Sequence, residues 1–301
     1  MKGMARRVLL VPDRGLQTRM VATAVLTPAA VIAAVVAIAV LLPPKVLGGV
    51  ALAAVFGLLA ARKARRRDDP ARVLGPDEAP KLHGLVERLC VRADIAKPDI
   101  VLEDVPQPNS WILDLPGRRP RLHLTRGLVD ALEPGELEAV IAHELCHVAH
   151  GDATVMTVVG LPGAALKEGA SGVRGIWFLM AGALAAWVVG TLASLGTSSL
   201  ARSRELAADA GAAELTGRPS ALASALMKLS ATAPRLPQED LRLAATRNAF
   251  NLLPAQVRKA DRDWRDDIAA APFVRRLTAT HPPVERRIAA LRAAEERLQR
   301  G

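Results

Sequence analysis

The sequence predicts a mainly α-helical protein with a small β-sheet, an α+β fold, whose soluble part is joined to about four transmembrane helices. Half of the 301 residues are hydrophobic, yet only 3% are aromatic and Tyr is absent, so Ala, Val and Leu supply most of the apolar content. Mean hydropathy is +0.20. Long uncharged runs alternate with charged stretches, and one charged stretch contains three short strand-like patterns. This composition suits helices and lipid-facing surfaces.

Residues 1–67 are predicted to form an N-terminal transmembrane hairpin. Residues 20–44 carry no charge, and this length exceeds the roughly 20 residues that cross a bilayer as a helix. A second uncharged run covers residues 46–61. A cleaved signal peptide is the alternative for the first run, but its apolar core is usually about 7–15 residues, and Pro43-Pro44-Lys45 stands where a small-residue cleavage site would lie. We therefore expect a retained anchor.

Basic residues flank both ends of this hairpin, and the net charge of the chain is +10. The two clusters are Lys2, Arg6, Arg7, Arg14 and Arg19, and Arg62, Lys63, Arg65, Arg66 and Arg67. A nucleic-acid-binding patch is the alternative, but that charge would lie on a soluble face rather than beside apolar spans. The positive-inside rule therefore predicts a multi-pass plasma (inner) membrane protein in contact with the bilayer, with both hairpin ends in the cytoplasm and no nucleic-acid partner.

Residues 68–152 are predicted to form the first part of a soluble domain. Residues 82–93 carry apolar side chains at helical spacing. Three later runs alternate or cluster apolar residues between Pro, Gly and Asn, which predicts strands within 98–105, 110–115 and 119–125.

Two helices follow these strands. Thr125 is a suitable N-cap for a brief helix that begins at the next residue. Pro134 suits the first position of a second helix, and Glu136 then faces the positive end of its dipole. This second helix carries the motif HELCH, residues 143–147.

Residues 153–201 are predicted to form a second membrane hairpin, followed by the second part of the soluble domain in residues 202–301. The apolar runs of the hairpin are 153–166, which is short, and 175–201, which is long enough to span. Beyond it, the pattern predicts a helix that ends at Gly217-Arg218-Pro219, another helix capped by Ser220, a loop-rich region at 233–267 and a charged amphipathic helix after Thr280.

The HELCH motif has the spacing of a zinc site. Residues four apart lie on the same face of a helix, so His143 and His147 can both donate a nitrogen to one tetrahedral Zn²⁺. Glu144 is then placed to take a proton from metal-bound water and to carry it to the leaving amine. The alternative is a helix with incidental histidines. His150 is a further candidate, but a rigid helix would carry it past the metal.

A catalytic zinc needs a third protein ligand and an open fourth position. Glu205 and Asp209 again lie four residues apart in a helical context. Glu205 can complete a His-His-Glu shell, and Asp209 can accept the free N–H of a ligand histidine and so fix its tautomer. The alternative is a solvated acidic face.

Together these residues resemble the HtpX-like membrane zinc metalloproteases, HExxH gluzincins related to the CAAX prenyl proteases. HELCH (143–147), RSRELAADAGAAEL (202–215) and THPPVERRIAAL (280–291) occur in the order of that family. The resemblance implies a zincin-type catalytic domain with one Zn²⁺ per chain and Glu205 as its third ligand. It also implies a membrane-integral endopeptidase that cleaves membrane or misfolded proteins by metal-activated water attack, in stress response and membrane-protein quality control.

The chain departs from the family pattern at two positions, and Pro108-Asn109-Ser110-Trp111 matches only loosely the strand motif of the family, an Asn followed by small and aromatic residues. Leu206 stands where an aromatic residue is common, and Cys146 where a small residue is usual. We expect Cys146 to pack rather than to react.

Substrate binding and oxyanion stabilisation have weaker candidates. Zincins bind peptide as an added strand, so Asn109 or the backbone of Ser110 and Trp111 is expected to pair with substrate, unless Trp111 belongs to the core. With no Tyr in the chain, His281 and Arg287 are the candidate oxyanion donors. Their alternative is a Pro-bounded helix cap with a solvated arginine.

Zinc ligation also constrains topology. The ligands must meet on one side of the membrane, so the chain crosses an even number of times between residues 147 and 205. Residues 153–166 must then cross together with 175–201, or both runs are re-entrant or packed on protein. Competing functions are a prenyl-protein protease, which would want more spans, and a zinc-stabilised or metal-free membrane scaffold, which would need no general base.

Overall fold

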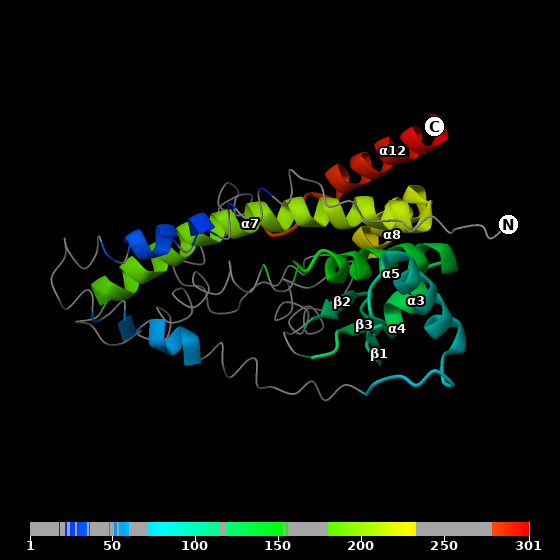
Figure 1. The fold of residues 1–301 in the computed structure, drawn as a ribbon, viewed down its shortest axis with the longest axis horizontal. Coiled ribbons are helices and arrows are strands. Elements are labelled where there is room, and N and C mark those ends of the chain that lie inside the picture. Colours follow the sequence, from blue (N-terminus) through cyan, green and yellow to red (C-terminus); the bar gives the residue numbers. More distant parts are fainter. Residues whose placement is uncertain are drawn as a thin grey trace.

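The structure is a computed structural model that describes residues 72–114, 118–152, 180–232 and 279–300, with residue 155 and scattered helical positions between 18 and 59. Of the predicted short span 153–166 it describes one position, and the predicted loop-rich region 233–267 lies outside the described residues. The described part is mostly helical with one small sheet (Figure 1), as the sequence predicts.

The sheet has three strands, β1 (Asp99–Glu103), β2 (Ser110–Leu113) and β3 (Arg121–Thr125), in the order β1-β3-β2. β1 runs parallel to β3, and β2 runs antiparallel to it. All three lie within the predicted ranges, because short apolar runs between turn residues favour strands. In the order β1-β3-β2, β2 is an edge strand of this sheet.

Along the chain, helix α3 (Pro80–Ala93) precedes the three strands, and α4 (Arg126–Ala131) and α5 (Pro134–Ala149) follow them. The Thr125 side chain accepts a hydrogen bond from the backbone N–H of Leu128, which confirms the predicted cap of α4. α5 begins at Pro134 as predicted, with a capping box between Glu133 and Glu136. α5 packs against α3, β2 and the two helices that follow it in the described chain, so it is the central helix.

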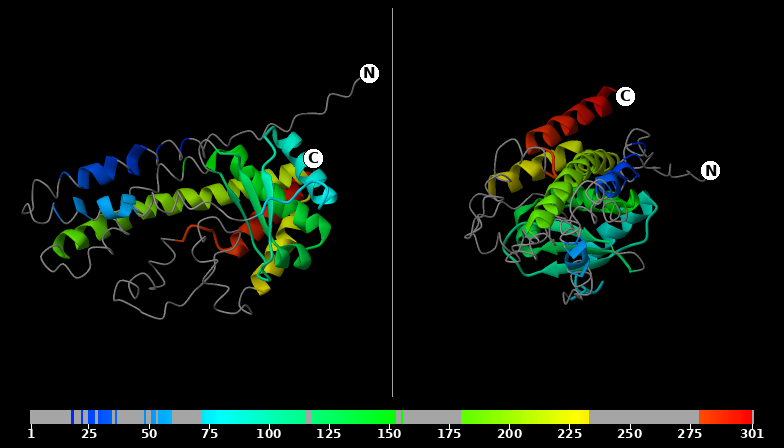
Figure 2. Two further views of the ribbon diagram at one scale, coloured as in Figure 1. Left: turned by 90° about the horizontal axis from the view of Figure 1, so that it is seen from below. Right: turned by 90° about the vertical axis from the view of Figure 1, so that its left-hand side faces the viewer.

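The longest element is α7 (Met180–Thr216), a continuous helix of 37 residues and about 55 Å. The predicted span and the predicted helix after it are therefore one helix, which ends before Gly217 at a positive φ of 65°. Its first half extends away from the sheet, and the described helical positions of the N-terminal segment lie at the same end of the molecule (Figures 1 and 2). Within the described residues, the stretch Leu184–Thr216 is the one helix long and apolar enough to cross a membrane.

Two helices complete the core, α8 (Pro219–Thr232) and α12 (Val284–Arg300). The predicted N-cap role of Ser220 is wrong, because the helix already begins at Pro219, whose ring suits the first turn. The Ser220 backbone N–H instead donates to Glu295 of α12 at 3.1 Å. α12 packs on α7 and α8, on the far side of α7 from the sheet (Figure 1).

Candidate metal centre

The two histidines of HELCH lie one turn apart on α5 and face the same point. Their Nε2 atoms are 3.2 Å apart, and their rings meet edge to face. His143 is buried, and His147 is more accessible at its ring. The helical spacing therefore brings both nitrogens to one place, as the sequence predicts.

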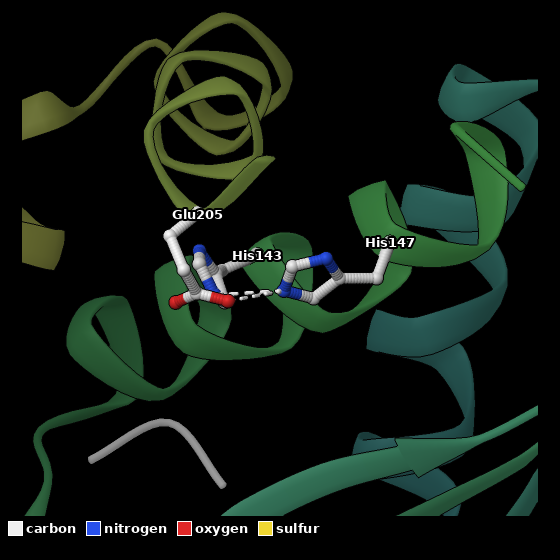
Figure 3. Close-up of side chains that lie close together, drawn as sticks. All are labelled: His143, His147 and Glu205. Carbon is white, nitrogen blue, oxygen red and sulfur yellow. Dashed lines mark hydrogen bonds and ion pairs between the residues drawn. The ribbon is translucent and has the colours of Figure 1, made fainter. Parts of the chain in front are cut away.

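Glu205 reaches this place from α7 (Figure 3). Its carboxylate oxygens lie 3.4 Å from Nε2 of His147 and 3.8 Å from Nε2 of His143. The three ligand atoms of this group all lie within 4.8 Å of one another. The alternative of a solvated acidic face is wrong, because Glu205 and Asp209 are both buried.

Behind His143 lies a buried carboxylate that is itself held by an arginine. Nδ1 of His143 is 3.0 Å from Oδ1 of Asp209, and Arg287 donates to both oxygens of Asp209, at 2.8 and 2.6 Å. Burial works to lower the pKa of Arg287, but the Asp209 carboxylate outweighs it and holds that pKa above its ordinary value. The alternative of a solvated arginine is wrong, since Arg287 is 1% exposed.

His147 has a matching arrangement that the sequence analysis missed. Its Nδ1 lies 2.6 Å from Oδ2 of Asp152, and Nη2 of Arg204 lies 2.6 Å from the same oxygen. Gly151, with a positive φ of 66°, turns the chain at the end of α5 and brings Asp152 back to the histidine. The sequence feature that could have indicated this contact is the Gly151-Asp152 pair directly after the helix that carries the motif.

The charges of the site suit a divalent cation. Four buried carboxylates, those of Glu144, Asp152, Glu205 and Asp209, face two buried guanidinium groups, those of Arg204 and Arg287. With all of them ionised, these described side chains carry a formal charge of −2. Oε2 of Glu205 is buried and accepts no hydrogen bond within the described part of the chain. A cation between two imidazoles and a carboxylate would satisfy that oxygen and balance the charge, and N and O donors of this kind fit Zn²⁺.

Glu144 lies next to the first histidine and is 2% exposed. Burial raises the pKa of its carboxyl, against the lowering influence of His143 and His147. The hydroxyl of Ser110 on β2 donates to Oε1 of Glu144 at 2.8 Å. The sequence analysis considered only the backbone of Ser110. Its place beside Trp111 on an alternating strand was the signal that the two side chains point to opposite faces.

His281 lies in the segment before α12 and is 7% exposed. Its Nε2 is 4.0 Å from Oε2 of Glu205, and its Nδ1 is 3.0 Å from the Thr280 hydroxyl. Burial lowers the pKa of this imidazole, which favours the neutral ring. Both candidate oxyanion donors reach the metal group: Arg287 binds Asp209 through Nε and Nη2 and places Nη1 3.5 Å from Oε2 of Glu205, and His281 stands at the edge of the group.

The remaining predicted residues lie around the site. The Asn109 backbone is bonded to Thr125 through both its N–H and its carbonyl, and the buried Trp111 ring stacks on His123 at 4.7 Å. Trp111 therefore packs as a core residue. Cys146 is buried, as expected, and burial raises the pKa of its thiol.

Comparison with known proteins identifies a matching family and several relatives. The profile of Peptidase family M48 matches residues 76–295. "Protease HtpX homolog 2" of Methanosarcina acetivorans is 34% identical over 306 residues, which cover 95% of this chain and 97% of that protein. "Protease HtpX homolog 1" of Streptomyces coelicolor is 39% identical over 72% of this chain and 71% of that protein. The solved structure of S. mikatae Ste24p is similar at 17% identity with a TM-score of 0.49, over 79% of this chain and 57% of that one.

Asp152→Asn should weaken Zn²⁺ binding about 10- to 100-fold, because the amide no longer draws the Nδ1 proton of His147 as the carboxylate does. The measurement is zinc competition against a chelator in detergent micelles. Asp130→Asn, the same change on the exposed side of α4, is the matched control and should bind zinc normally. Equal affinities of the two variants would contradict the role given to Asp152.

Proposed function

Since this chain belongs to Peptidase family M48 and is an HtpX-like metalloendopeptidase, we propose that it is a membrane-integral, zinc-dependent enzyme whose metal is held by His143, His147 and Glu205. The observation that carries this proposal is the convergence of these three side chains from two helices that are distant in the chain. One ion per chain fits the group, and an ion held by three protein ligands would keep a fourth position for water and substrate.

The residues around the metal group have different roles in the proposed reaction. Zn²⁺ held by these residues would act as a Lewis acid and would make a bound water molecule acidic near neutral pH. Glu144 accepts the proton of that water and passes it to the amine that leaves when the peptide bond breaks. The carboxylates of Asp209 and Asp152 lie 3.0 and 2.6 Å from Nδ1 of His143 and His147, and they would orient each Nε2 toward a bound metal.

We place substrate along the outer side of β2, where the edge of the described sheet offers backbone groups to an added strand. The backbone of β2 from Ser110 onward would provide this edge, because the backbone N–H and carbonyl of Asn109 are already bonded to Thr125. His281 is the proposed donor to the developing oxyanion, because its buried Nε2 lies beside the metal group.

The same reasoning supports a four-segment membrane arrangement. Leu184, Val188 and Leu192 recur every four residues on α7 and are 43%, 42% and 62% exposed, an apolar stripe suited to lipid. We propose that residues 1–67 and 153–201 form two membrane hairpins, and that 68–152 and 202–301 form the two parts of one cytoplasmic catalytic domain in the inner membrane.

Substrates of such an enzyme are proteins or peptides, and we propose membrane proteins and misfolded chains in quality control. Ala201 is the last uncharged residue of the apolar half of α7, and Glu205 follows one helical turn later, about 6 Å along the axis. A metal so close to the proposed membrane surface favours segments that emerge from the bilayer. A scaffold protein is the competing function, and the buried general base Glu144 argues against it.

Glu144→Gln should retain zinc while peptide cleavage falls by about 10²- to 10⁴-fold, since an amide cannot accept the proton of water. The measurement combines metal analysis with cleavage of casein and of a destabilised membrane protein, using detergent-purified enzyme. Glu138→Gln, on the same helix outside the metal group, is the control. Full cleavage by the Glu144→Gln variant would refute the protease mechanism, and cleavage of casein alone by the unchanged enzyme would refute the proposed substrate class.

His281→Ala should lower kcat by about 10²- to 10³-fold with little change in KM or zinc content, because an oxyanion donor acts in the transition state. His83→Ala, on α3 away from the metal, is the control and should keep normal turnover. Unchanged kcat in His281→Ala would place the oxyanion donor elsewhere.

The topology predicts cytoplasmic positions for residue 67 and for the C-terminus. Alkaline phosphatase fused after either point should be inactive and green fluorescent protein fused there should fluoresce, with the opposite result for fusions after residue 44. Active phosphatase at residue 67 or at the C-terminus would overturn the cytoplasmic assignment.

A further inference from the structure

Ser110 makes a side-chain contact with Glu144 that has no part in the reaction described above. Its side chain is fully buried, and its Oγ donates to Oε1 of Glu144 at 2.8 Å, although 34 residues separate the two in the chain. Ser110 is the side-chain donor to Glu144 within the described part of the chain. A donor at this distance forms a charge-assisted hydrogen bond with an ionised carboxylate, which is stronger than a bond between neutral groups.

The residues on both sides of Ser110 are held in place by contacts with the neighbouring strand. Asn109 is bonded to Thr125 through its N–H and its carbonyl, and Thr125 is also the cap of α4. Trp111 stacks on His123 of the central strand. Ser110 itself pairs with Leu124. The hydroxyl therefore comes from a fixed point of the sheet rather than from a mobile loop.

This contact constrains the orientation of the Glu144 carboxylate. The terminal torsion of a glutamate has broad, roughly two-fold preferences, so burial alone does not orient its carboxylate. A bond to Oε1 fixes that torsion and leaves Oε2 of Glu144 as the oxygen that takes the proton of water. General-base catalysis requires such a fixed geometry.

We propose that Ser110 is a positioning residue for the general base: its hydroxyl orients the Glu144 carboxylate for proton transfer and links that carboxylate to the edge strand along which substrate binds. The inference rests on the proposed function, because it takes Glu144 as the base and β2 as the substrate edge. The inference gives these two neighbouring residues different roles, because the Ser110 side chain points toward the metal group and the Trp111 side chain packs on the opposite face of the sheet.

The test compares Ser110→Ala, Ser110→Thr and Glu144→Gln in detergent-purified full-length enzyme, with kcat, KM, zinc content and unfolding temperature measured for each. Ser110→Ala should lower kcat about 10- to 100-fold while KM and zinc content stay within about twofold of the unchanged enzyme. Ser110→Thr keeps the hydroxyl and should recover most of kcat. Ser230→Ala, the same change on the exposed side of α8, is the control.

The outcomes separate this inference from the function on which it depends. An active Glu144→Gln enzyme would remove the proposed base itself, whereas an inactive one beside a fully active Ser110→Ala enzyme would overturn the role of Ser110 alone. A loss in Ser110→Ala that appears in KM, or that comes with lost zinc, would also overturn it, because that result indicates substrate binding or structure. If Ser110→Ala folds poorly, Ser110→Cys keeps the side-chain size with a weak donor and should show the same selective loss of kcat.

Discussion

The crossing of α5 and α7 is the constraint on which the rest of the structure depends. Both helices carry small side chains that are fully buried, Ala139 and Ala142 on α5 and Ala208 and Ala212 on α7, and small residues let two helix backbones approach closely. The same crossing buries a cluster of charged side chains, each of which would cost several kcal/mol without a partner. The apolar contacts therefore bring the buried carboxylates together, and these carboxylates in turn require arginines and a cation as partners.

The continuity of α7 gives this crossing a second consequence. One helix carries both the apolar stretch proposed to cross the bilayer and the carboxylate of Glu205, so the distance between them is set by helical rise and not by a loop. Arg202 begins the charged part of α7 and donates to the carbonyl of Ala279 at 2.6 Å, in the segment that carries His281. The membrane part, the third ligand and the proposed oxyanion donor are thus joined through one rigid element.

Local features of this fold could be predicted from the sequence because they depend on neighbours in the chain. The spacing of His143 and His147, the cap at Thr125 and the three strands all follow from periodicity or from turn residues. The cap predicted at Ser220 failed because a proline one residue earlier had already begun the helix.

The partners that complete the site could not be predicted in this way. Asp152 approaches Arg204, and Ser110 approaches Glu144, across long stretches of intervening sequence. Such pairs depend on how helices cross and on which face of a strand points inward, so they are properties of the tertiary structure. Spacing alone indicated the acidic pair Glu205 and Asp209, but their burial became clear only from the packing of α7 against α5 and α12.

The two histidine supports are chemically alike but differ in their attachment. Asp209 and Arg287 lie on α7 and α12, so the support of His143 is held by two packed helices. Asp152 lies after the turn at Gly151, where the chain leaves α5 toward the proposed third membrane segment. A Cβ at Gly151 would meet nothing within 4 Å, so the constraint there is the positive φ and not space. The support of His147 therefore joins Arg204 of α7 to the turn by which the chain leaves α5.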